Sequence, residues 1–111
     1  MTGEPQTVDA LLEQAVAHHA SDLHLTVGAP PAVRVLGELR PLDGCPPLDR
    51  DGIRSLLYRI LTTEQQKRFE LDRQLDFSYG VPGVARFRVN VFQQRDSVAA
   101  AFRIVPDDLK T

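Results

Sequence analysis

The sequence predicts an α+β domain in which three helices pack against a mainly antiparallel sheet of about six strands. Three observations lead to this fold class. Apolar residues recur at helical spacing near the N-terminus and again in the middle of the chain. In the other segments they alternate with polar residues, as in strands that bury one face. Short turns containing Gly or Pro separate the alternating segments, which favours hairpins.

The N-terminal helix is expected over about residues 7–19, with Thr7 as its N-cap. A sheet or another helix must cover its apolar face, which comprises Val8, Leu11, Leu12, Ala15 and Val16. The next strand, over about residues 22–27, has alternating apolar positions at Leu23, Leu25 and Val27. A hairpin follows, with strands over residues 32–36 and 38–42 joined by a glycine turn.

Two further helices are expected in series and on the same side of the sheet. Asp49 or Asp51 can cap the first of them. Its apolar face comprises Ile53, Leu56, Leu57, Ile60 and Leu61. The second begins where Thr63 and Gln66 have the spacing of a capping box, and it ends near Leu71.

The last third of the chain is predicted to form three strands, because its apolar residues recur at every second position. The first strand carries Leu75, Phe77 and Tyr79 on one side, and the second carries Ala85, Phe87, Val89 and Val91. A turn over residues 80–83 joins these two strands. The third strand, over residues 97–105, points Val98, Ala100, Phe102 and Ile104 inward.

Shared apolar faces determine the register of the last hairpin. A turn centred on Arg95 and Asp96 satisfies this requirement and places Arg88 directly opposite Arg103. A five-residue loop in the preceding hairpin would place Asp76 opposite Arg88. Like charges that face each other across two strands are unfavourable by a few tenths of a kcal/mol when exposed, so the arginine pair needs a counter-anion.

Two interpretations of this charged face stay open. Asp76, Arg88 and Arg103 can form a solvated charge ladder on the outside of a one-sided sheet. Arg86, however, adds a third positive charge against the single negative charge of Asp76. Because the planar guanidinium group suits phosphate and carboxylate, the face can instead receive an anion from a partner.

Composition limits the possible classes of protein. A chain of 111 residues fits one domain, and 42% hydrophobic with 25% charged residues is typical of a folded globular protein. The net charge of −2 offers no general basic field to nucleic acid. No apolar run approaches the ~18 residues of a membrane span, so a cytoplasmic location is predicted. The single cysteine, Cys45, excludes an intrachain disulfide.

No metal or catalytic site is predicted from the polar residues. Asp22 and His24 share one strand face and follow His18 and His19 closely, but zinc needs three or four converging ligands. The two histidines are better placed to interact with the C-terminus of the first helix. Nothing suggests a Ser/His/Asp or Cys/His arrangement.

Five segments carry a family likeness in a fixed order: ASDLHL at 20–25, VRVLGEL at 33–39, LDFSY at 75–79, VPGVARFRVNVF at 81–92 and FRIVP at 102–106. Together they resemble the N-terminal domain of the type IV pilus retraction (twitching motility) ATPases, the PilT branch of the secretion ATPase superfamily. The resemblance implies a PAS-like domain over residues 1–106, with helices on one face of the sheet. It also implies that residues 107–111 are a truncated linker to an absent RecA-like ATPase domain.

In motors of this family six subunits form a ring that acts with the pilus machinery at the inner membrane, using ATP and Mg²⁺. The N-terminal domain packs against the ATPase domain of a neighbouring subunit, and its arginines reach the nucleotide phosphates. By motif position, the resemblance assigns this role to Arg88 and Arg103, and less directly to Arg86 and Arg95.

The same resemblance makes Asp22, His24 and Asp76 a structural signature rather than catalytic residues. The sequence also departs from the pattern of the whole motor. It contains no G-x-x-x-x-G-K-[ST] loop to cradle phosphates, so the chain alone should not hydrolyse ATP. Asp96 stands where relatives often have glycine, and its charge could oppose that of Arg95.

Two alternatives belong to other functional classes. The chain could be a free-standing PAS-like sensor of a small ligand or a protein-interaction module, although the inward positions are filled by Val, Leu and Phe. Binding of single-stranded nucleic acid would need aromatic residues interleaved with the arginines on one face. Only Phe92 meets that requirement, because Phe87 lies on the opposite face.

Overall fold

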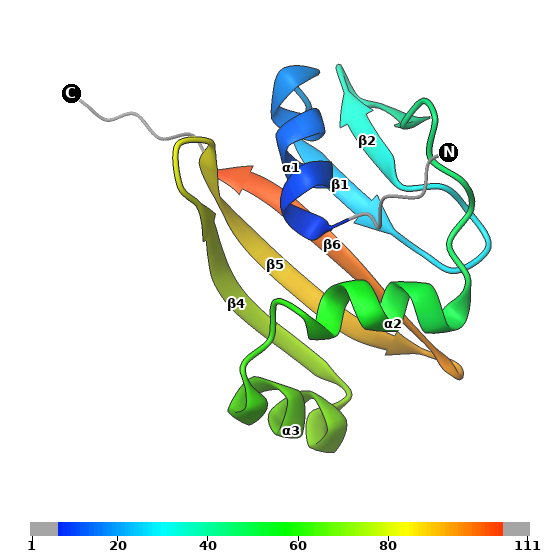
Figure 1. Cartoon of the computed structure of the whole chain (residues 1–111), viewed down its shortest axis with the longest axis vertical. Helices are drawn as coiled ribbons and strands as arrows, with labels where there is room; N and C mark the ends of the chain where they lie inside the picture. The colour runs from blue at the N-terminus through cyan, green and yellow to red at the C-terminus, as the bar shows by residue number, and fades with distance from the viewer. Residues whose placement is uncertain (1–6, 106–111) are drawn as a thin grey trace.

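A six-stranded antiparallel sheet runs through residues 7–105, the part of the chain that the computed structural model describes (Figure 1). The strands lie in the order β3-β2-β1-β6-β5-β4. Their bounds are β1 Asp22–Leu25, β2 Ala32–Val35, β3 Glu38–Pro41, β4 Gln74–Val81, β5 Ala85–Gln94 and β6 Ser97–Val105. The last strand pairs with the first at the centre of the sheet. With the three helices below, this confirms the predicted α+β class.

Two of the three helices begin where the sequence places them. In α1, Val8–Ala17, the Thr7 hydroxyl accepts a hydrogen bond from the Ala10 amide at 3.1 Å. In α2, Arg50–Tyr58, the Asp49 carboxylate accepts from the Gly52 amide at 2.6 Å, which decides between the two predicted caps. Within residues 7–105 no helix has the length and apolar character needed to cross a membrane.

The third helix, α3, Thr63–Asp72, begins one residue before the predicted position. Its capping box is formed by Thr62 and Gln65, whose side chains each bond the other's backbone amide at 3.1 and 3.0 Å. The box expected at Thr63 and Gln66 is therefore wrong by one residue. The Gln66 side chain donates instead to the carbonyl groups of Tyr58 and Leu61, and so ties α3 to the end of α2.

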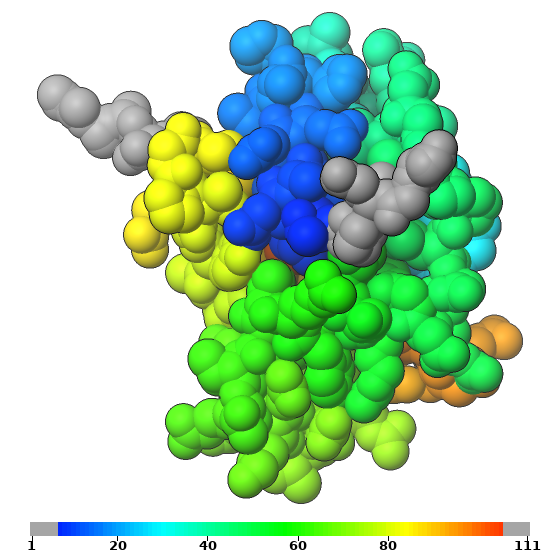
Figure 2. Space-filling view, viewed as in Figure 1, coloured from blue at the N-terminus to red at the C-terminus, as the bar shows by residue number. Residues whose placement is uncertain are grey.

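All of the core lies between the helices and one face of the sheet. α1 contacts β1, α2 contacts β6 and α3 contacts β4, and the helical layer hides most of β6 in the space-filling view (Figure 2). Phe69, Phe87 and Phe102 are each at most 2% exposed, and burial of such a side chain contributes about 1.5–3 kcal/mol. Because these rings occupy the space beneath the helices, the inner face resembles a packed core more than a ligand pocket.

The last hairpin has the predicted register. Phe87 pairs with Ile104, and Arg88 lies directly opposite Arg103. Arg95 begins the two-residue turn between β5 and β6 with a φ of 58°, and the Asp96 carboxylate in that turn accepts from Arg50 at 2.7 Å. Asp96 therefore forms an ion pair with Arg50 at the start of α2.

The preceding hairpin is shifted by two residues from the predicted register. Ser78, and not Asp76, lies opposite Arg88. The reason is a tighter turn, in which the Val84 amide donates to the Val81 carbonyl at 3.0 Å and Gly83 supplies a φ of 77° after Pro82. A shift of two leaves every side chain on its predicted face.

The first strand ends earlier than predicted. β1 stops at Leu25, and Val27 forms only an isolated bridge with Leu48 and is 42% exposed. The cause is a competing backbone interaction, because the Gly28 amide donates to the Leu48 carbonyl and the Leu48 amide donates to the Ala29 carbonyl. The expectation that Val27 lies on the buried side of the strand is wrong.

A polar contact connects the N-terminal helix to the edge strand β4. The Tyr79 hydroxyl donates to the Asp9 carboxylate at 2.5 Å. Burial raises the pKa of Tyr79, and the hydrogen bond to Asp9 raises it further, to about 12. The neutral phenol is therefore favoured in the folded chain, whereas an unfolded tyrosine ionises near pH ~10.

The variant Tyr79→Phe should lower the free energy of unfolding at pH 7 by about 1 kcal/mol, because it removes this hydrogen bond. The unmodified chain should lose stability as the pH rises from ~10 through the raised pKa, and the variant should lose less. Urea unfolding at pH 7 and at pH 11 measures both effects. Tyr58→Phe is the matched control and should keep the alkaline loss due to Tyr79. Equal alkaline loss in Tyr79→Phe and the unmodified chain would contradict this assignment.

Candidate functional site

The face of the sheet opposite the helices carries two cross-strand rows of residues. The first row, from β3 to β4, is Leu39, Arg34, Asp22, Arg103, Arg88 and Ser78. The second is Pro41, Ala32, His24, Ala101, Asn90 and Asp76. The small side chain of Ala101 lies in the middle of the second row, between two larger polar residues. The sheet is therefore hollowed at its centre.

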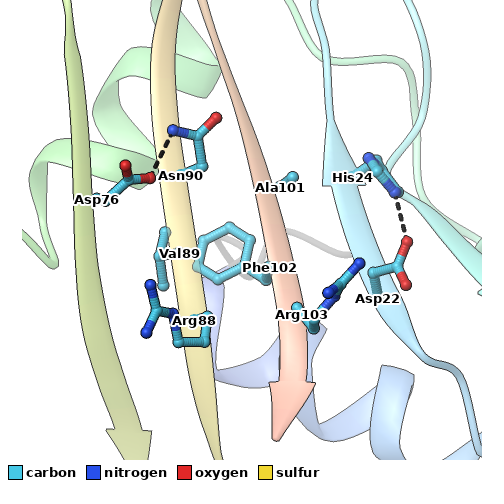
Figure 3. Close-up of a pocket in the computed structure, with 9 residues that line it drawn as sticks. All are labelled: Asp22, His24, Asp76, Arg88, Val89, Asn90, Ala101, Phe102 and Arg103. Carbon is cyan, nitrogen blue, oxygen red and sulfur yellow. Dashed lines mark hydrogen bonds and ion pairs between the residues drawn. The ribbon is translucent and has the colours of Figure 1, made fainter.

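This hollow is a groove of about 430 Å³ that is open to solvent (Figure 3). Two carboxylates, two guanidinium groups, an imidazole and an amide surround it: Asp22, Asp76, Arg88, Arg103, His24 and Asn90. Val89 and Phe102 contribute to its lining from below. A groove of this size with converging polar side chains is suited to a small charged group.

Arg88 and Arg103 are exposed, and they extend in opposite directions from neighbouring strands. Arg103 points towards β1 and Arg88 points towards β4 (Figure 3). No described residue forms an ion pair or a side-chain hydrogen bond with either guanidinium group. Like charges on adjacent strands repel, and this splayed arrangement reduces the repulsion.

The other two predicted arginines are placed differently. Arg86 lies on the same face, two residues before Arg88 in β5, and pairs with Val105. Arg95 lies in the turn at the far end of β5, roughly 20 Å from Arg88 at the usual rise per strand residue. The structure therefore brings three of the four arginines together and separates Arg95 from them.

Asp22 is the most strongly bonded side chain of the groove. One of its oxygens accepts from the Ser21 hydroxyl at 2.6 Å. The other accepts from His24 Nε2 at 2.7 Å and from Arg34 Nε at 3.3 Å. Burial raises the pKa of the Asp22 carboxyl, but these three donors together lower it below its usual value. Asp22 is therefore held in place as an anion.

On the opposite wall, Asp76 accepts a hydrogen bond from the Asn90 side-chain amide at 2.7 Å. Asn90 and Arg34 are not among the residues predicted from the sequence. Asn90 could have been noticed, because asparagine is depleted in strand interiors. Arg34 could have been found from its place in the VRVLGEL segment, on the polar side of β2.

The described residues contain no group of three or more His, Cys, Asp and Glu side chains that could hold a metal ion. Asp22 and His24 form a pair without a third ligand. The backbone amides of His18 and His19 donate hydrogen bonds to the carbonyl groups of Gln14 and Val16, at the C-terminus of α1.

Comparison with known proteins shows to which family the chain belongs. The chain is 43% identical over 104 residues to the type IV pilus retraction ATPase PilT of Pseudomonas aeruginosa, which covers 94% of this chain. It superimposes on the crystal structure of the pilus retraction motor PilT with bound ADP, with a TM-score of 0.88, 42% identity and 95% of this chain covered. The chain belongs to the PilT/secretion ATPase superfamily.

Within this superfamily the chain corresponds to the N-terminal domain, and it covers only 30% of P. aeruginosa PilT and 31% of the solved PilT chain. The Legionella pneumophila ATPase DotB has the same fold, with a TM-score of 0.76 at 24% identity over 96% of this chain and 31% of its own. No family model matches the chain.

The double variant Arg88→Gln/Arg103→Gln should fold normally and should be as stable as the unmodified chain, or more stable by a few tenths of a kcal/mol. It removes two positive charges that face each other across neighbouring strands, and it breaks no ion pair with any residue among 7–105. Urea unfolding at low salt measures the difference. The matched control, Arg59→Gln/Lys67→Gln, removes two exposed charges from the helical side. A loss of more than about 2 kcal/mol in the groove variant alone would indicate a structural role.

Proposed function

We propose that this chain is the N-terminal domain of a cytoplasmic, hexameric type IV pilus retraction ATPase. In this role it supplies Arg88 and Arg103, assisted by Arg86, to the phosphates of a nucleotide held by a RecA-like domain. We also propose that residues 1–106 form the domain and that residues 107–111 begin the linker to the RecA-like domain. That linker lies outside the described residues.

One observation carries this proposal. Two guanidinium groups stand on an uncovered sheet face and have no counter-anion among residues 7–105. Nearly the whole chain matches the N-terminal part of a pilus retraction ATPase. Arginine presents a rigid fork of donors that matches a phosphate, and its charge persists at any physiological pH. A phosphate from outside the domain would complete this face.

The residues of this chain fit a contact to phosphate but not the binding of a whole nucleotide. They include no glycine-rich cradle, and the described residues hold no carboxylate cluster for Mg²⁺. Mg²⁺, which the ATPase domain would bind together with ATP, neutralises charge on the phosphates. Arg88 and Arg103 would add positive charge at the γ-phosphate from the opposite side, where charge develops during phosphoryl transfer.

This arrangement would couple catalysis to assembly. The groove belongs to a rigid sheet, so its arginines can reach a nucleotide only when the outer face packs against the domain that holds it. If that domain belongs to a neighbouring subunit, each ATP site depends on two chains. Changes at the nucleotide would then be transmitted to the N-terminal sheet, and arginines that report nucleotide state in this way act in other phosphoryl-transfer proteins.

A chimaera tests this function. The segment of P. aeruginosa PilT that matches this chain is replaced by the chain itself, and ATP hydrolysis is measured. The chimaera should hydrolyse ATP, and Arg88→Ala should lower kcat by roughly 100-fold, the usual effect of losing one donor to transition-state charge. The isolated chain should hydrolyse none.

Arg59→Ala is the control, since Arg59 is an exposed arginine at the end of α2 on the helical side. It should leave turnover unchanged. If Arg88→Ala and Arg59→Ala chimaeras hydrolyse ATP equally fast, Arg88 has no part in the mechanism. Assembly of each chimaera is checked by its mass in solution, so that loss of the ring is not mistaken for loss of chemistry.

A further inference from the structure

Asp22 lies directly across from Arg103 in the first row of the groove. Neighbouring strands are about 4.8 Å apart, so the carboxylate is within reach of the guanidinium group without any movement of the backbone. Figure 3 shows Arg103 extending from β6 towards Asp22. The two side chains form no ion pair in this structure, and no residue among 7–105 occupies the donors of Arg103.

The Asp22 carboxylate can accept a further hydrogen bond. A carboxylate has about four acceptor positions on its two oxygens. Three of them are used, since one oxygen accepts from Ser21 and the other accepts from His24 and Arg34. The side chain is only 16% exposed and is held by these donors. Asp22 is therefore a fixed negative charge at the β1 side of the groove.

Asp76 is the carboxylate at the β4 side of the groove, but unlike Asp22 it does not lie directly opposite an arginine. It lies opposite Asn90 in the second row and accepts a hydrogen bond from that amide, while Ser78 occupies the place opposite Arg88. Of Arg88 and Arg103, it is therefore Arg103 that has a carboxylate as its direct cross-strand neighbour. For one phosphate to contact both arginines, Arg103 must turn away from Asp22 towards Arg88.

We propose that Asp22 is a positioning residue that competes with the phosphate for Arg103, and so weakens the hold of the groove on its anion. This proposal rests on the proposed function and adds a means of release to it. Two guanidinium groups without an opposing carboxylate would retain a phosphate tightly. An internal carboxylate lowers that affinity, because Arg103 has an alternative partner whenever the anion leaves.

The test measures the affinity of the 111-residue chain for inorganic tripolyphosphate, followed by the NMR signals of the arginine Nε–H groups. Asp22→Asn keeps the shape of the side chain and removes its charge, and its single carbonyl oxygen can still accept from either Ser21 or Arg34. It should bind tripolyphosphate about 3- to 10-fold more tightly than the unmodified chain, a change typical of one partly screened charge pair.

A double-mutant cycle separates competition for Arg103 from a general change in charge. In the Arg103→Gln background, Asp22→Asn should change the affinity by less than about 2-fold. Arg34 also bonds Asp22, so Asp22→Asn could raise the affinity by freeing Arg34 instead of Arg103. In the Arg34→Gln background, Asp22→Asn should therefore still raise the affinity for tripolyphosphate by about the same 3- to 10-fold. Asp76→Asn is the matched control: any gain in affinity that it produces should persist in the Arg103→Gln background.

A second measurement does not depend on the folding of Asp22→Asn. In the Arg103→Gln variant, the pKa of the Asp22 carboxyl should be higher than in the unmodified chain, because a neighbouring positive charge has been removed. NMR titration of the carboxyl carbon detects the change. An unchanged pKa overturns the proposal.

The outcomes distinguish this proposal from the proposed function. If Asp22→Asn and the unmodified chain bind tripolyphosphate equally, and both bind it more tightly than Arg88→Gln/Arg103→Gln, Asp22 does not compete and the role of the arginines stands. A gain in Asp22→Asn that persists without Arg103 also overturns the competition. If the unmodified chain binds no more tightly than the arginine double variant, both proposals fail.

Discussion

The register of the β5–β6 hairpin is the constraint on which the outer face depends. Phe87 and Phe102 must both point into the core, and a slip of one residue between the strands would move an arginine into it. The transfer free energy of the two rings, about 1.5–3 kcal/mol each, is far larger than the few tenths of a kcal/mol lost to repulsion between exposed like charges. The core therefore forces Arg88 and Arg103 to lie opposite each other.

The rest of the groove follows from neighbouring strands of the same sheet. β1 brings Asp22 and His24 beside β6, although these residues are about 80 positions away from Arg103 in the chain. β4 brings Asp76 beside Asn90 on the other side of the arginines. The helices cover the opposite face, so the charged groups remain open to solvent (Figures 1 and 3). A rigid sheet thus presents two guanidinium groups that have no ion-pair partner in the part of the chain the structure describes, between two carboxylates that accept hydrogen bonds. The phosphate that we propose would complete this surface.

The last hairpin could be predicted from the sequence because strict alternation and a two-residue turn leave one register. The preceding hairpin could not, since the segment from Gly80 to Val84 allows turns of different lengths that all keep the same faces. The third helix shows a similar ambiguity: two Thr–Gln pairs have equal spacing, and only packing of Gln66 against α2 selects between them. The bonds around Asp22 depend on the pairing of β1 with β2 and β6, which no local pattern specifies.

The central claim is that the outer face of this sheet receives a nucleotide phosphate bound by another domain. The most direct measurement is a structure of the complete motor, or of its chimaera with PilT, with a non-hydrolysable ATP analogue. The account predicts that the guanidinium nitrogens of Arg88 and Arg103 lie within about 3 Å of phosphate oxygens on a neighbouring domain. An outer face that is turned to solvent, or covered by a surface without the nucleotide, would contradict it.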